Sequence, residues 1–125
     1  MRVLLDTHLL LWALAAPSKL PAAARKRIEA GEVFVSAASI WEISIKSALG
    51  RLEADPQEVL AAIAPAGFGL LPITGEHAAK VRELPRLHKD PFDRMLVAQA
   101  SIEPMILLTN DEALAGYGAI VTIAR

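Results

Sequence analysis

Five carboxylates in this chain stand where a helix is expected to begin, and their spacing makes them candidates for one chemical site. Asp90 and Asp93 are three residues apart around a proline, which together with the first acid forms a strong helix-start signal. Asp6 and Asp111 each follow a short apolar run, and Glu42 lies in a further helical segment. Carboxylates that gather within a few ångströms repel one another unless a cation offsets their charge. Their hard oxygen ligands favour Mg²⁺ or Mn²⁺.

A purely structural explanation is open for each acid. Asp6 fits the N-cap of the helix that follows it, and Ser39-x-x-Glu42 fits a capping box. Against the capping box, Glu42 is flanked by Trp41 and Ile43 in an apolar helix, where an unpaired carboxylate is costly to bury. The metal site becomes the better interpretation only if the fold brings the acids together.

The two acids at 90 and 93 differ in their expected roles. Asp90 precedes proline and best fits the cap of its helix. Asp93 lies one turn further on, on the side of Leu96 and Val97 that should face the sheet and the other acids. We therefore expect Asp93 to be a metal ligand and Asp90 to be the helix cap. Whether Asp90 also contacts the metal, directly or through water, stays open.

A carboxylate-held metal site can hydrolyse a phosphodiester by activating water and stabilising the leaving oxygen. Arg86, Lys89 and Arg94 lie beside the paired acids and are candidates to bind substrate phosphate, with simple surface solvation as the alternative. The histidines lack a helical ligand spacing, which disfavours zinc. We expect them in loops or at the surface, with only the last close enough in sequence to touch substrate: His8, His77 and His88.

Strands alternate with helices along the chain, which predicts an α/β fold, a three-layer α/β/α sandwich around a mainly parallel sheet. In such folds ligands collect where the carboxyl ends of strands meet helix N-termini. The segment at 38–49 should present one apolar side, formed by Ile40, Trp41, Ile45, Ala48 and Leu49. The predicted strands are 3–6, 32–36, 68–73, 105–108 and 119–124, and the predicted helices are 7–16, 21–30, 38–49, 55–66, 76–84 and 91–103.

Composition indicates one globular domain over residues 1–125, with 54% hydrophobic and 22% charged residues. A formal net charge of −1 argues against broad electrostatic binding of nucleic acid, and the absence of cysteine excludes disulfides and thiol catalysis. The apolar N-terminus superficially resembles a secretory signal, but Asp6 and His8 interrupt it and residues 2–5 fit a buried strand. We expect a cytoplasmic chain that does not enter a membrane.

Four motifs, in order along the whole chain, resemble those of the PIN-domain ribonucleases, in particular the VapC toxins of type II toxin–antitoxin systems. The resemblance implies a five-stranded parallel sheet, an endoribonuclease dependent on Mg²⁺ or Mn²⁺, a homodimer and a small antitoxin that neutralises the toxin. The motifs are Leu4-Leu5-Asp6-Thr7-His8; Ser39-Ile40-Trp41-Glu42-Ile43-Ser44-Ile45-Lys46 with Gly50-Arg51-Leu52; Asp90-Pro91-Phe92-Asp93-Arg94 running into Leu96-Val97-Ala98-Gln99-Ala100; and Leu108-Thr109-Asn110-Asp111.

By motif position, the acidic quartet of that family falls on Asp6, Glu42, Asp93 and Asp111. We expect Asp6, Asp93 and Asp111 to bind the metal, and Glu42, like Asp90, is a possible further ligand, direct or through water. The resemblance further implies that two hydroxyls help shape the site, those of Thr7 and Thr109.

Three other functions compete with this interpretation. A haloacid-dehalogenase-like phosphatase needs a second aspartate two residues after the first, where this chain has His8. A receiver domain would need paired acids at the first strand and a lysine after a late strand, and neither is evident. A PIN fold that only binds RNA or regulates, without nuclease activity, stays open.

Overall fold

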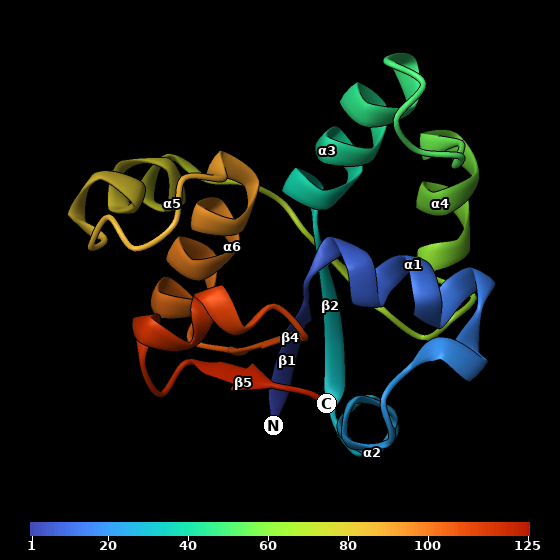
Figure 1. The fold of residues 1–125 in the computed structure, drawn as a ribbon, viewed down its shortest axis with the longest axis horizontal. Coiled ribbons are helices and arrows are strands. Elements are labelled where there is room, and N and C mark those ends of the chain that lie inside the picture. The colour runs from blue at the N-terminus through green and yellow to red at the C-terminus, as the bar shows by residue number, and fades with distance from the viewer.

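The computed structural model describes residues 1–125 as strands alternating with helices (Figure 1). The chain also forms three 3₁₀ segments, at Pro17–Lys19, Val81–Glu83 and Glu112–Tyr117. The main elements are β1 Arg2–Leu5, α1 Thr7–Ala15, α2 Ala22–Ala30, β2 Glu32–Ser36, α3 Ala37–Ala48, α4 Pro56–Ile63, β3 Gly69–Leu71, α5 Gly75–Lys80, α6 Pro91–Ile102, β4 Ile106–Thr109 and β5 Val121–Ile123.

The five strands form one sheet in the order β3-β2-β1-β4-β5, and all four strand pairs are parallel. This confirms the predicted α/β class and sharpens "mainly parallel" to wholly parallel. The N-terminal strand β1 lies at the centre, where Val3, Leu4 and Leu5 are buried on both faces of the sheet. A short, uninterrupted apolar run is what a doubly covered parallel strand requires.

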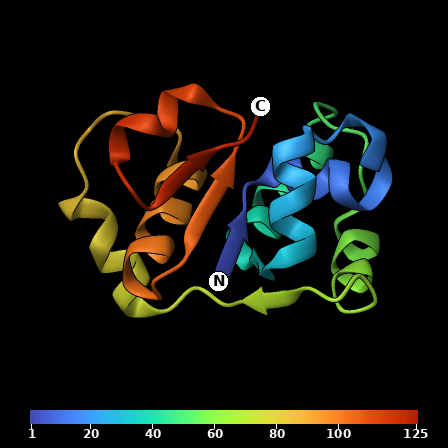
Figure 2. The ribbon, with the colours of Figure 1, turned by 90° about the horizontal axis from the view of Figure 1, so that it is seen from below.

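Helices cover both faces of the sheet, which gives the predicted three layers (Figure 2). Val3 and Leu5 point into one core with residues of α1, α2 and α4. Leu4 points into the other core, which α6 supplies with Leu96 and Val97. Alternate residues of the same strand therefore feed opposite cores, as the two-residue period of a strand demands.

The strand order reverses beside β1, because β2 and β3 lie on one side of it and β4 and β5 on the other. In open parallel sheets such a switch point leaves a crevice beyond the carboxyl ends of the two central strands. Asp6 follows β1 directly, and its backbone N–H donates to the Leu108 carbonyl of β4 at 3.1 Å. Asp111 follows β4 after one further residue, so both acids lie at this crevice.

Three local predictions are wrong. Helix α3 begins at Ala37 with Ser36 as its N-cap, so the capping box of Ser39 and Glu42 does not form. The helix predicted over 76–84 changes to a 3₁₀ turn after Lys80, and α4 ends at Ile63 instead of near residue 66. In each case the helical stretch was placed correctly and its boundary was not: Ser36 caps α3 through the Ala38 N–H, and the other two helices pass into turns at their C-terminal ends.

Most of the apolar side predicted for α3 faces outward, and of its five residues only Ile40 packs against the core. Trp41 and Leu49 are 59% and 63% exposed, whereas Glu42 and Ile43 of the same helix are buried. The helix thus directs its acidic residue inward and leaves part of its apolar surface uncovered. None of the helices is long and apolar enough to cross a membrane.

Candidate active site

All five predicted acids line one small pocket at the switch point of the sheet. They come from four separate parts of the chain, namely the end of β1, helix α3, the start of α6 and the turn after β4. No hydrophobic residue lines this acid pocket, whose wall consists of Asp6, Thr7, His8, Glu42, Lys46, Asp90, Asp93, Asn110 and Asp111.

Asp6 is buried at the floor of the acid pocket and is held by two hydrogen bonds. Its Oδ1 accepts from the Leu9 backbone N–H at 2.8 Å, which makes it the N-cap of α1, and its Oδ2 accepts from the Thr109 hydroxyl. Burial raises the pKa of Asp6 above its usual value, and the bond from Thr109 opposes that rise. Capping and site formation are thus combined in one residue.

Glu42 is buried on the wall formed by α3, and both of its oxygens have partners. Oε1 accepts from the Thr7 hydroxyl at 2.7 Å, and the Thr7 oxygen also lies 3.0 Å from Ser39 Oγ. Oε2 forms an ion pair with Lys46 at 2.5 Å, one helical turn further on. The hydrogen bond that Lys46 donates to Glu42 raises the pKa of Lys46, so its ammonium stays charged. Sequence reasoning gave Lys46 no role, although its i,i+4 spacing from Glu42 was the available signal.

Asp90 and Asp93 play different parts at the start of α6. Asp90 Oδ1 accepts from the backbone N–H groups of Phe92 at 2.8 Å and Asp93 at 3.1 Å, so Asp90 is the N-cap. Asp93 points its carboxylate into the acid pocket. Burial, followed by repulsion from Asp90, raises the pKa of Asp93 from 3.8 to about 7. Asp93 is therefore the acid whose charge the chain alone compensates least.

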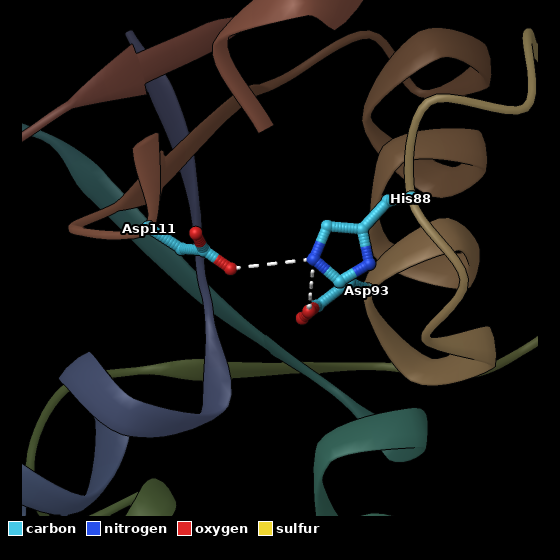
Figure 3. Close-up of side chains that lie close together, drawn as sticks. All are labelled: His88, Asp93 and Asp111. Atoms are coloured by element: carbon cyan, nitrogen blue, oxygen red, sulfur yellow. Dashed lines mark hydrogen bonds and ion pairs between the residues drawn. The ribbon is translucent and has the colours of Figure 1, made fainter. Parts of the chain in front are cut away.

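His88 lies over the acid pocket between two of its acids (Figure 3). Its Nε2 is 3.3 Å from Asp111 Oδ2 and 3.6 Å from Asp93 Oδ2. Its Nδ1 accepts from the Asp90 backbone N–H at 3.1 Å, so the ring proton resides on Nε2 and faces the carboxylates. Asp111 uses its other oxygen to accept from the Ala113 N–H at 3.0 Å and cap the following turn.

The donor set fits a hard divalent cation. Carboxylate oxygens dominate, no sulfur ligand is present, and ligand atoms of His88, Asp93 and Asp111 lie within 4.8 Å of one another. Because Nε2 of His88 carries a proton in this arrangement, it acts as a donor and not as a metal ligand. Of the metal ligands predicted from the sequence, Asp93 and Asp111 belong to this cluster, and Asp6 lines the same pocket.

A second, basic hollow lies beside the acid pocket and is lined by Arg86, His88, Lys89 and Arg94. Arg86 and Lys89 are exposed. Arg94 instead donates to the backbone carbonyls of Val81 and Pro85 at 2.9 and 3.0 Å and to the Tyr117 hydroxyl at 3.2 Å. These bonds fasten the loop before α6, so Arg94 shapes the hollow by fixing its wall.

The expectation that all three histidines lie in loops or at the surface is wrong for His77, which is buried in α5. Its Nδ1 accepts from the Thr74 N–H at 3.0 Å, and its Nε2 lies 2.6 Å from Glu103 Oε2. The reciprocal bond from His77 N–H to the Thr74 hydroxyl completes a capping box with histidine in place of Glu or Gln. The Thr74-x-x-His77 spacing was the available signal.

Fold and site together define a class, the α/β proteins with a wholly parallel sheet and a carboxylate pocket beyond its central strands. The model of the PIN domain family matches residues 3–119. The chain belongs to the PIN-domain family, and this membership indicates a nuclease.

Three solved structures of similar fold are described as VapBC or toxin–antitoxin complexes. The chain is similar to VapBC2 from Rickettsia felis bound to a DNA fragment from its promoter, with a TM-score of 0.73, 15% identity and full coverage of both chains. A toxin–antitoxin complex from Klebsiella pneumoniae has a TM-score of 0.66 and 19% identity and covers 96% of this chain and 95% of its own. DNA-bound VapBC from Salmonella typhimurium has a TM-score of 0.66, 18% identity and 98% coverage of both chains.

One curated relative is matched locally. Sixty residues are 45% identical to part of the ATP-dependent rRNA helicase SPB4 of Gibberella zeae. The match covers 48% of this chain and 8% of the helicase, so the chain spans a small part of that protein's length. The P-loop signature of nucleotide-binding motors, G-x-x-x-x-G-K-[ST], does not occur in the sequence.

Proposed function

We propose that this chain is a VapC-type toxin, an endoribonuclease that requires Mg²⁺ or Mn²⁺ and hydrolyses RNA phosphodiester bonds. The observation that carries the proposal is the convergence of five carboxylates from four parts of the chain in one pocket without a single hydrophobic wall residue. Collecting so many like charges in one place is costly for a protein. A role in holding metal accounts for that cost, and helix capping alone does not.

The side chains around the acid pocket hold the catalytic carboxylates in place. Asp6, Asp93 and Asp111 serve as metal ligands, and Glu42 completes the catalytic quartet. Thr109 orients Asp6, and Thr7 orients Glu42, each through its hydroxyl. When bound, the divalent ion supplies an activated water and stabilisation of the leaving oxygen. Asp90 caps α6, and a contact between Asp90 and the metal, direct or through water, stays a possibility.

The basic hollow provides the contact with the RNA backbone. Lys89 and Arg86 are exposed beside the acid pocket and offer their charges to phosphate oxygens. Arg94, a predicted phosphate ligand, supports this surface through its bonds to the loop carbonyls and retains only part of its donor capacity for substrate.

The partner we propose is a small antitoxin, because the three similar structures are described as toxin–antitoxin or VapBC complexes. The homodimer and the cytoplasmic location stay predictions from the sequence. Co-expression with the product of the neighbouring reading frame tests the partner: a stable complex that suppresses cleavage is expected, and free nuclease activity in its presence would remove that frame as the candidate.

Cleavage of cellular RNA by the purified chain with Mg²⁺ or Mn²⁺ tests the activity. Asp6→Ala and Asp93→Ala should each lower the rate by at least about 100-fold, since each removes a ligand of the reacting centre. Glu29→Ala, an exposed acid of α2, is the matched control and should cleave like the unmodified chain. Equal cleavage by all four proteins would refute the assigned site. RNA binding without cleavage by the unmodified chain would favour the non-catalytic PIN module.

A further inference from the structure

Lys46 is a cation within the acid pocket, and nothing in the proposed function uses it. Its ammonium lies 2.5 Å from Glu42 Oε2, and the carboxylates of Asp90 and Asp93 attract it as well. The side chain reaches this position from α3, the helix that also carries Glu42, so the pair is fixed by one rigid element. A positive charge is therefore built into the wall of the acid pocket that α3 forms.

We propose that Lys46 takes the place of a second divalent ion: its ammonium compensates Glu42, and the aspartates bind a single ion. The inference rests on the proposed function. It adds how many metal ions the acid pocket binds and explains that number by the charge of Lys46. Two-metal hydrolytic sites hold their ions about 3.5–4 Å apart and distribute the carboxylates between them. Here the Glu42 carboxylate is already paired with the Lys46 ammonium.

The hydrogen bonds of the Glu42 carboxylate leave little room for a metal ion beside it. Its Oε1 accepts from Thr7 at 2.7 Å and its Oε2 is paired with Lys46. A magnesium ion would need an approach of about 2.0–2.1 Å to the same oxygen, into the space that the ammonium fills. Repulsion between the ammonium and a divalent ion at that distance adds to the steric conflict.

The aspartates, unlike Glu42, have no lysine or arginine partner. No lysine or arginine ion pair is formed by Asp6, Asp93 or Asp111, and the nearest basic group to the last two is the His88 ring. The carboxylates without a lysine or arginine partner in the acid pocket are thus the aspartates, while Glu42 is paired with Lys46. One divalent ion held by the aspartates, together with the ammonium on Glu42, gives the acid pocket two cationic centres from a single metal.

Counting bound Mn²⁺ by electron paramagnetic resonance with equilibrium dialysis, on the full chain at neutral pH, tests the proposal. The unmodified chain and Lys46→Arg should each bind one Mn²⁺ per chain. Lys46→Met should bind two, and adding Glu42→Gln to it should return the count to one. Lys80→Met is the matched control, because it removes a lysine from another helical Lys–Glu pair, that with Glu83, and should leave the count at one.

The outcomes separate the two proposals. Two Mn²⁺ bound by the unmodified chain, or one bound by Lys46→Met, would overturn the role of Lys46 and leave the nuclease proposal standing. No Mn²⁺ bound by the unmodified chain would contradict the metal-dependent function itself, and the inference with it. Lys46 is partly exposed, with 39% of its side chain accessible, so the variants should fold; circular dichroism verifies this, and Lys46→Gln serves as a second neutral variant.

Discussion

The acids of the pocket differ in how the chain compensates their charge. Glu42 is paired with a lysine and a hydroxyl, and Asp6 accepts from an N–H and a hydroxyl. Asp93 has only the His88 ring at 3.6 Å, and its pKa rises to about 7 because burial and Asp90 both disfavour its charge. This unequal compensation supports the proposal that Asp93 is a metal ligand.

Asp93→Asn should stabilise the metal-free chain in a pH-dependent way. Between pH 4 and 7 the folded chain holds a proton on Asp93 that the unfolded chain has released, so stability is lost as the pH rises through this range. At pH 8.5 in EDTA the variant should exceed the unmodified chain by an amount on the order of a few kcal/mol, and by almost nothing near pH 4. Urea unfolding across this pH range measures the difference.

The same variant should bind Mn²⁺ more weakly, because it replaces a charged ligand by a neutral one. Glu29→Gln, an exposed acid on α2, is the control and should show neither effect. A stability difference that does not change with pH, or an unchanged Mn²⁺ affinity in calorimetry, would contradict the role of Asp93.

At the scale of elements, helix N-termini build the site. Asp6 caps α1, Asp90 caps α6 and Asp111 caps the 3₁₀ turn after β4, and all three face the same pocket. Carboxylates are favoured at these ends by the free N–H groups and by the helix dipole. The fold therefore uses its own capping requirements to reduce the cost of assembling acids.

Two substitutions at Asp90 should distinguish the effect of its helix cap from the effect of its charge. Asp90→Ser retains a cap and removes the charge, whereas Asp90→Ala removes both, so the alanine variant should be less stable than the serine variant by about 1 kcal/mol. Both should lower the pKa of Asp93, because Asp90 raises it. Urea unfolding and titration of Asp93 by NMR provide the two measurements.

Asp55 offers a matched control, since it also precedes a proline and caps α4 through the Gln57 N–H at 2.9 Å, away from the acid pocket. Its serine and alanine variants should differ by a similar amount and leave Asp93 unaffected. Equal stability of the two Asp90 variants would show that Asp90 is not an effective cap.

The whole molecule leaves an apolar surface uncovered. A groove between α3, α4 and β3 includes Trp41, Leu60 and Leu70, which are 59%, 40% and 47% exposed. Contiguous exposed apolar surface of this kind marks an interaction site more often than a solvated face. The predicted homodimer would cover it with a second copy.

Leu60→Glu should therefore weaken self-association at least tenfold, because it places a charge in the middle of the apolar groove. Sedimentation velocity over a concentration series measures the monomer–dimer equilibrium. Leu87→Glu is the control, since Leu87 is 51% exposed in the loop before α6 and far from this groove in sequence. A monomeric unmodified chain, or equal weakening by both variants, would contradict dimerisation through this surface.

Local signals in the sequence were sufficient for most of the architecture. Apolar runs such as 3–5 are short and bounded by polar residues, and Asp-Pro at 55–56 and 90–91 starts a helix in both places. These are properties of neighbouring residues, which physical rules for caps and periodicity capture directly. The position of the acids after parallel strands then predicted their convergence, because the carboxyl ends of such strands lie at one edge of the sheet.

Partners distant in sequence decided what local rules could not. Ser39 was expected to cap α3 but contacts Thr7, 32 residues away. His77 is buried with a hydrogen-bond partner, because its Nε2 lies 2.6 Å from the Glu103 carboxylate, 26 residues further on. Arg94 likewise binds backbone carbonyls of the preceding loop, those of Val81 and Pro85, which no local pattern around it indicates.

The types of the site residues, their order and the fold that gathers them were thus determined by the sequence alone. Which acid is paired with a lysine, which caps a helix and which has no lysine or arginine partner was decided by the tertiary structure, since these depend on the distances between side chains that only folding sets.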